Sequence, residues 1–147
     1  MSGRLQRSLA LIACSVALGA CALSPQSVPA SPPVHARTLM ETLSSWNGQG
    51  LTYPAGIPKV TALEIVVAPG ADTGWHLHPV PSLAYILEGS LEISLKDGSS
   101  RRVSAGQAVA EVVNTVHLGR NPGERPTRLV VFYLGTTELP LTIASPP

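Results

Sequence analysis

The sequence is poor in cysteine, in aromatic residues and in charge. Only two of its 147 residues are cysteines, and both, Cys14 and Cys21, lie near the amino terminus. Residues 22–147 therefore offer neither a disulfide nor a cysteine ligand for a metal. Aromatic residues make up 4% of the chain and charged residues 13%, against 44% hydrophobic residues. A chain with so much apolar and so little charged sequence is expected to fold as a globular domain.

Neither sign of charge dominates. The formal net charge is +1, and because Arg4 and Arg7 lie near the amino terminus, residues 21–147 contain one more acidic than basic residue. With no basic patch, we expect no nucleic-acid partner. The sequence also has no glycine-rich phosphate loop, no Gly-x-Ser-x-Gly elbow and no internal repeat. Any chemistry must therefore come from the histidines.

Long hydrophobic runs are missing too. The apolar run over residues 9–20 follows Arg4 and Arg7, which is the layout of an export signal. At 12 residues, this run is shorter than the roughly 20 that a membrane-spanning helix needs. The run predicts a signal peptide over residues 1–20.

The end of this run, Leu18-Gly19-Ala20-Cys21, resembles a bacterial lipobox. In a lipobox the cysteine becomes the lipidated first residue of the mature protein. The resemblance implies lipidation at Cys21 and a cell-envelope lipoprotein that faces the periplasm and contacts the membrane through its lipid only. Two alternatives stay open: a signal cleaved after Ala36, leaving a soluble periplasmic or secreted protein, and a short membrane anchor.

Proline and serine are concentrated in the segment that follows. Their content over residues 21–36 is typical of a semi-rigid tether, so we expect one folded domain over residues 37–147. Leu39, Leu43 and Trp46 have the spacing of a short amphipathic helix, but Leu39, Glu41 and Leu43 also fit strand alternation. Both alternatives remain open here.

Beyond Trp46 the chain consists of short apolar segments separated by turn residues such as Pro-Gly, Asp-Gly and Ala-Gly pairs. Five of these segments are expected to be strands: residues 60–68, 83–87, 91–95, 107–113 and 127–134. Short strands at this spacing predict an all-β domain, either an antiparallel sandwich, a barrel or a jelly roll.

The four histidines divide into one in the tether, His35, and three in the predicted domain, His76, His78 and His117. Side chains alternate between the faces of a strand, so His76 and His78 are expected to point the same way. A His-x-His pair is also common in strands as hydrogen-bonded core or surface residues. The third histidine in a later segment favours a metal site.

The spacing around these histidines is specific. Five residues separate Gly70 from His76, and Gly89 lies eleven residues after His78; ten residues separate Gly106 from His117, and three more separate His117 from Asn121. This pattern resembles the two motifs of the cupin superfamily, Gly-x5-His-x-His-x3,4-Glu-x6-Gly and Gly-x5-Pro-x-Gly-x2-His-x3-Asn. The resemblance covers roughly residues 60–134.

The resemblance implies a fold and a cofactor. Cupins are small jelly-roll barrels, also called double-stranded β-helices, whose motif histidines bind a divalent metal inside the barrel. We therefore expect His76, His78 and His117 to bind one divalent metal ion. Imidazole suits several metals, so the ligands do not distinguish Fe, Mn, Zn, Ni or Cu.

Two motif positions depart from the pattern. Ser82 stands where the first motif has its glutamate, and Val112 and Asn114 replace the proline and glycine of the second. Three neutral imidazoles still suffice for a metal with open coordination positions. Ser82 could hydrogen-bond a metal-bound water, or it could simply fill space.

Glu111 is the candidate replacement for the missing carboxylate. It lies in the apolar segment 107–113, where a carboxylate facing the core is unfavourable unless it is paired or bound to metal. It also precedes His117 by six residues, an even number that keeps both on one face of a straight strand. Facing inward, it would be a fourth ligand, a catalytic group or an acceptor for a histidine N–H. The alternative is that Glu111 faces solvent or pairs with an arginine.

Two aromatic residues are further candidates. Trp75 and Tyr85 are expected either at the mouth of a pocket or in ordinary packing, and Tyr85 joins Ser82 as a candidate for the substrate pocket. The arginines could select an acidic substrate, although arginines on a sheet usually face solvent.

Two functions from different classes remain. The first is an enzyme with a mononuclear metal, of the dioxygenase or isomerase type, acting on a small organic molecule. The second is a non-catalytic envelope protein that binds a metal or a small ligand. We favour the first because a three-histidine site with open coordination is typical of chemistry. A homodimer is compatible with either.

Overall fold

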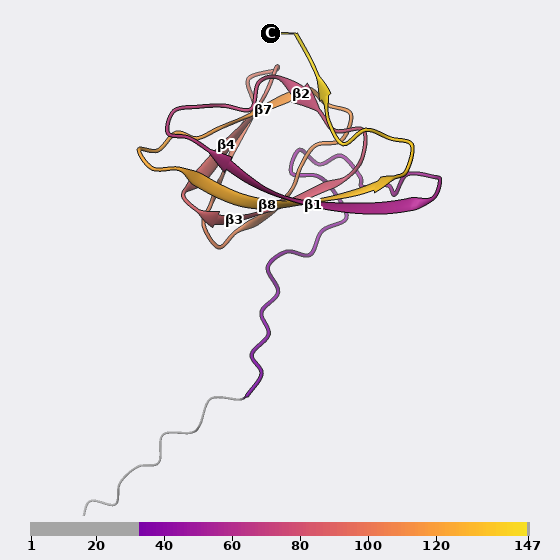
Figure 1. Cartoon of the computed structure of the whole chain (residues 1–147), viewed down its shortest axis with the longest axis horizontal. Coiled ribbons are helices and arrows are strands. Elements are labelled where there is room, and N and C mark those ends of the chain that lie inside the picture. Colours follow the sequence, from indigo (N-terminus) through magenta and orange to yellow (C-terminus); the bar gives the residue numbers. More distant parts are fainter. Residues whose placement is uncertain (1–32, 147) are drawn as a thin grey trace, which may run out of the picture. The chain divides into compact units, whose positions relative to one another are not determined.

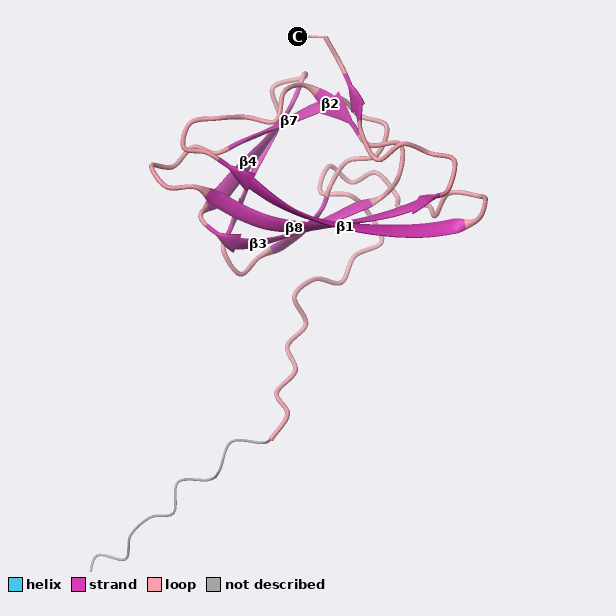
Figure 2. Cartoon of the chain, viewed as in Figure 1, coloured by secondary structure: helices cyan, strands magenta, loops and turns pink. Residues whose placement is uncertain are grey.

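The structure is a computed structural model and describes residues 33–146 (Figure 1). Its compact unit spans Ala36–Pro147. The predicted signal peptide, Cys14, Cys21 and most of the predicted tether lie outside the described residues. Figure 2 shows strands and loops and no helix in the described part, so none of these residues forms a helix that could cross a membrane.

Within residues 33–146, nine strands build two sheets, and every pair of neighbouring strands is antiparallel. In chain order they are β1 (Pro58–Val67), β2 (His76–Leu77), β3 (Ser82–Glu88), β4 (Ser90–Leu95), β5 (Ser100–Ser104), β6 (Ala108–Ala110), β7 (His117–Arg120), β8 (Thr127–Thr136) and β9 (Ile143–Ala144). One sheet has the order β1-β8-β3-β6 and the other β5-β4-β7-β2-β9. Figure 1 shows β1, β8 and β3 along one side of the barrel and β4, β7 and β2 along the other. The prediction of an all-β jelly-roll barrel is confirmed.

The core lies between the inner faces of the two sheets. Along β3, Ser82, Ala84 and Ile86 are buried while Leu83 and Tyr85 are half-exposed, which is the alternation of a strand with one face in the core. Ile86 from one sheet and Ile93 from the other are both fully buried in the same apolar cluster. Tyr85 is therefore on the outer face of its sheet.

Four of the five predicted strands match β1, β3, β4 and β8 closely. The fifth prediction, residues 107–113, is wrong at its end, because β6 stops at Ala110. The chain turns shortly afterwards at Asn114, which has a φ of 50°. Sequence patterning missed β5 because its residues are mostly polar. It missed β2, β7 and β9 because they have only two, four and two residues.

Residues 42–51, here called the arm, form neither the helix nor the strand that their spacing allowed. They fold back on themselves, with a single bridge between Ser44 and Gly50. The amide of Trp46 donates a hydrogen bond of 3.0 Å to the carbonyl of Ala110. The arm therefore covers the open edge of β6, where unpaired backbone groups need partners.

Two motif residues have structural roles. Gly89, at the turn between β3 and β4, has a φ of 76°, and a Cβ there would lie 2.7 Å from Oγ1 of Thr127, so the position requires glycine. Asn121 is fully buried, and its side-chain amide donates to the carbonyls of Val67 and Arg125 at 3.0 and 2.8 Å. It joins the end of β1 to the turn before β8.

Candidate metal centre

The short strands β2 and β7 bring the three histidines together. His76 and His117 are directly opposite each other in the antiparallel pairing, so their side chains share one face of the sheet. His78 follows one residue after β2, and its ring centroid lies 4.8 Å from that of His76 and 5.0 Å from that of His117. One nitrogen from each ring can be chosen so that all three lie within 4.8 Å of one another. This is the cluster that the spacing predicted.

Backbone carbonyls determine which nitrogen of each ring is available. The Nδ1 atoms of His76, His78 and His117 lie 2.8, 2.8 and 2.9 Å from the carbonyl oxygens of Gly74, Leu141 and Thr115. A carbonyl can only accept, so each Nδ1 carries a hydrogen and Nε2 is the nitrogen that is left for a metal. Three separate segments thus prepare three Nε2 donors.

The Nε2 atom of His117 shows that this arrangement fits a metal ion. It is buried and has no hydrogen-bond partner among the described residues. A buried acceptor without a partner is unfavourable in a metal-free protein and becomes favourable when it binds a cation. Three neutral imidazoles are a donor set that zinc, iron, copper and nickel accept.

Burial keeps His76 and His117 in the neutral form that binds a metal ion. Burial lowers the pKa of His76 and of His117 below the usual value of 6.5. The ionised carboxylate of Glu111 opposes this effect at both rings, but burial outweighs it. The two imidazoles are therefore neutral at pH 7 and do not need to lose a proton when a metal binds.

Glu111 points into the site rather than to solvent or an arginine. It is buried, and its Oε2 lies 3.4 Å from Nε2 of His78. Burial alone would raise the pKa of Glu111. The combined effect of His78, His117 and the Ser82 hydroxyl lowers it by a larger amount, so the pKa is below its usual value. A carboxylate oxygen facing an imidazole lone pair is stabilised by a cation between them, whether a metal ion or a proton.

Ser82 and Glu111 form a buried pair across neighbouring strands. The amide of Glu111 donates to the carbonyl of Ser82 at 2.9 Å, so Glu111 continues the pairing of β6 with β3. The Ser82 hydroxyl donates a 2.8 Å hydrogen bond to Oε2 of Glu111. The carboxylate absent from the motif position on β3 is thus supplied by the residue beside it on the adjacent chain segment.

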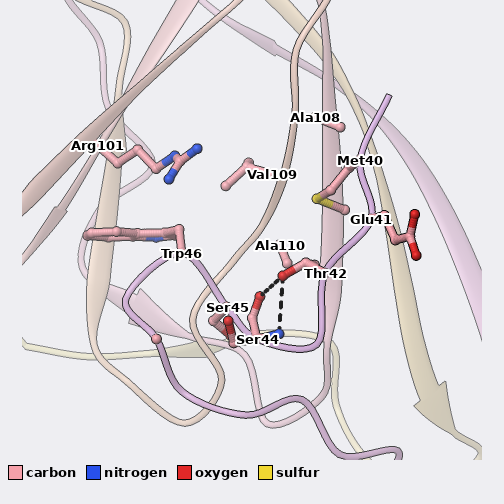
Figure 3. Close-up of a pocket in the computed structure, with 11 residues that line it drawn as sticks. Met40, Glu41, Thr42, Ser44, Ser45, Trp46, Arg101, Ala108, Val109 and Ala110 are labelled. Atoms are coloured by element: carbon pink, nitrogen blue, oxygen red, sulfur yellow. Dashed lines mark hydrogen bonds between the residues drawn. The ribbon is translucent and has the colours of Figure 1, made fainter. Parts of the chain in front are cut away.

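The arm holds the backbone of Glu111 from the other side, which sequence patterning did not reveal. The hydroxyl of Ser45, a residue only 2% exposed, donates a 2.8 Å hydrogen bond to the carbonyl of Glu111. Figure 3 shows Ser45 beside Ala110 in a pocket of about 340 Å³ that Trp46 and Arg101 also line. None of the three histidines lines that pocket, so the arm acts on the site only through the backbone.

Two spaces adjoin the histidines. A small inner cavity of about 40 Å³ is lined by the three histidines, Glu111 and apolar side chains of the core. A wider, more open groove of about 690 Å³ has His76 and His78 among its lining residues. Tyr133 lines both spaces.

Tyr133 is a site residue that the sequence reasoning missed. Its ring centroid lies 5.2 Å from that of His78. Burial, with a smaller contribution from the charge of Glu111, raises the pKa of Tyr133 to about 12. The phenol therefore stays protonated and can donate a hydrogen bond at any physiological pH. A polar aromatic residue on the buried face of the apolar strand β8 was the available signal.

The remaining candidates from the sequence lie on different surfaces of the barrel. Trp75 is among the residues that line the groove. Tyr85 does not reach the site, because it alternates with the buried residues of β3 and so lies on the outer face of its sheet. Arg128 pairs with Glu64 and Glu88 on the surface.

Comparison with known proteins agrees with this geometry. The family model of the Cupin domain (Cupin_2) matches residues 63–133. A solved oxalate oxidase structure shares 22% identity and a TM-score of 0.50 over 58% of this chain. The oxalate decarboxylase of Lactobacillus farciminis, in its formate complex, shares 17% identity and a TM-score of 0.51, also over 58%. An uncharacterized conserved protein of Klebsiella pneumoniae with a double-stranded β-helix domain shares 17% identity, with a TM-score of 0.52 over 66% of this chain and 91% of its own.

These likenesses concern the fold. The match covers 45% of the oxalate oxidase chain and 26% of the oxalate decarboxylase chain, so most of each enzyme has no counterpart here. Among curated proteins, none matches this chain in sequence. The domain match and the solved structures together support the cupin superfamily, and the fold is the cupin double-stranded β-helix.

Proposed function

We propose that this chain is a mononuclear metal-dependent enzyme that acts on a small organic molecule. The observation that carries the proposal is the set of three Nε2 atoms, each made available by a carbonyl bond at Nδ1. A histidine cluster that served only packing would not need three independent backbone acceptors. Metal ligands, in contrast, commonly donate their second N–H to such an acceptor.

His76, His78 and His117 would hold one divalent ion, with Glu111 as a fourth ligand or as a base beside it. The ion would supply Lewis-acid or redox chemistry. Ser82 orients the carboxylate of Glu111 through its 2.8 Å hydrogen bond. The Tyr133 phenol, protonated at neutral pH, can hydrogen-bond a substrate oxygen in the groove. Apolar side chains such as Val67, Leu91 and Leu129 line the inner cavity beside the histidines and limit the access of water to it.

The proposal extends to the location of the protein. The apolar run over residues 9–20 and the cysteine that follows it, Cys21, are the basis for an exported envelope lipoprotein. Residues 21–36 would hold the barrel away from the membrane, with the groove open to small molecules in the periplasm.

Elemental analysis of the purified full chain tests the metal centre. We expect about one equivalent of divalent metal in the wild-type protein and none in His76→Ala or His117→Ala. His35→Ala is the matched control, since His35 is exposed and lies outside the cluster. Full occupancy in both site variants would contradict the assignment.

Turnover distinguishes the enzyme from a binding protein. When phenols, thiols or diketones are offered as candidate substrates, the metal-loaded chain should consume oxygen or convert at least one of them. A protein that retains its metal and converts none of them would favour the alternative, an envelope protein that binds a metal or small ligand without catalysis.

A further inference from the structure

The groove above the histidines has a chemical character of its own. Its walls are mainly apolar or aromatic: Leu63 and Ile65 from β1, Leu118 from β7, and the rings of Trp75 and Tyr133. Its volume of about 690 Å³ is within the range of sites for small organic ligands. Hydroxyl groups of Thr142 and Ser145 add neutral hydrogen-bonding positions.

No lysine or arginine is among the residues that line the groove. Among the residues that line it, Asp72 is the one with a permanent charge, and that charge is negative. Its position is fixed, since its Oδ1 accepts a 2.9 Å hydrogen bond from the amide of Gly74. A substrate carboxylate in this groove would meet no lysine or arginine and would be repelled by Asp72.

One cation contacts a wall residue of the groove from outside it. Nζ of Lys96 lies 4.1 Å from the centroid of the Trp75 ring, in a cation–π contact, and Lys96 does not itself line the groove. The contact holds the indole in place as a wall of the groove. The rings of Trp75 and Tyr133, which both line the groove, favour a flat ligand over a small, strongly hydrated one.

We infer that the groove selects an uncharged, flat, largely apolar molecule with an oxygen donor, such as a phenol, and discriminates against small carboxylates. The inference rests on the proposed metal centre, because His76 and His78 are among the residues that line the groove, so the donor oxygen would bind beside them. It separates this site from oxalate chemistry, despite the shared fold.

Calorimetric titration of the zinc-loaded full chain with catechol and with oxalate tests the inference. Both molecules can chelate a metal through two oxygens, but only oxalate is a dianion without apolar surface. We expect catechol to bind at least tenfold more tightly than oxalate. Oxalate binding as tight as that of catechol would overturn the inference.

Two variants separate the groove from the metal. Trp75→Ala should weaken catechol binding about tenfold and leave zinc content unchanged. Leu63→Lys should strengthen oxalate binding about fivefold by adding a cation to the wall. Val60→Lys is the matched control, since Val60 is exposed on the opposite face of the same strand and should change neither affinity.

The readouts distinguish the two proposals. If the wild-type chain retains no zinc after zinc loading, as measured before the titration, the metal centre is refuted. Zinc present with no effect of Trp75→Ala on catechol, and no gain of oxalate affinity in Leu63→Lys, refutes the substrate class alone.

Discussion

The Ser82 hydroxyl donates a buried hydrogen bond of 2.8 Å to Oε2 of Glu111, across two neighbouring segments of one sheet. Ser82 occupies the motif position where cupins have a glutamate, and Glu111 supplies a carboxylate from the adjacent position. The same Oε2 lies 3.4 Å from Nε2 of His78. Ser82 thus stands in place of the motif glutamate and orients the Glu111 carboxylate that takes over its position in the site.

Glu111→Gln should therefore weaken metal binding by about tenfold to a hundredfold, because it keeps the shape of the side chain but removes a negative charge beside the cation. The measurement is competition for zinc with a chromophoric chelator. Ser82→Ala should produce a smaller loss, since it removes only the hydrogen bond that orients the carboxylate. Glu124→Gln is the control, because Glu124 is exposed. Unchanged affinity in Glu111→Gln would exclude the carboxylate from the site.

Ser82→Glu restores the motif carboxylate and tests the same relationship from the other side. In a Glu111→Gln background it should recover divalent metal affinity, since the new carboxylate would start from the inner face of β3. In the wild-type background, two carboxylates would compete for one place, and the apo protein should be less stable. Recovery is measured with the same chelator, and no recovery would show that position 82 does not reach the metal.

The pH dependence of the metal-free protein follows from the histidines. Because burial lowers the pKa of His76 and His117 below 6.5, the unfolded chain binds more protons than the folded chain as the pH falls through 6.5. The free energy of unfolding should therefore decrease below pH 6.5, as measured by urea denaturation in the presence of EDTA. His117→Gln should show a shallower dependence. A free energy of unfolding that rises towards pH 5.5 would contradict the burial of these rings.

Gly89→Ala should destabilise the barrel strongly. Its positive φ disfavours alanine, and the added Cβ would also lie 3.1 Å from the Cα of Thr127, which cannot easily move. We expect a loss of about 3 kcal/mol in urea denaturation. Gly98→Ala is the matched control, since its φ of 89° is similar but nothing lies within 4 Å of its Cβ position. A loss of about 1 kcal/mol is expected there, and equal losses in the two variants would show that the Thr127 contact is unimportant.

The proposed lipidation of Cys21 can be tested through detergent partition and precursor processing. The wild-type chain should partition into the detergent phase of a Triton X-114 extraction, and Cys21→Ser should accumulate as an unprocessed precursor. Cys14→Ser is the control within the same leader and should be processed normally. A soluble form that begins near Arg37 would refute the anchor while leaving export intact.

The sequence by itself determined the longer apolar strands and the identity of the three histidines. The strands β1, β3, β4 and β8 could be predicted because their apolar residues alternate or run continuously between turn residues, and this is a local property. The histidines could be assigned because two spaced motifs, from Gly70 to Gly89 and from Gly106 to Asn121, constrain many positions at once.

Only the tertiary structure decided how the site is completed. Glu111 meets Ser82 across 29 residues, and the carbonyl of Leu141 meets His78 across 63 residues, so neither contact leaves a mark on local periodicity. The even spacing from Glu111 to His117 was a poor guide, because β6 ends at Ala110 and the two residues reach the site from different segments. Tyr133 and the groove depend likewise on the packing of one sheet against the other. Local pattern predicts which face a side chain occupies, but only the packed barrel determines what that face meets.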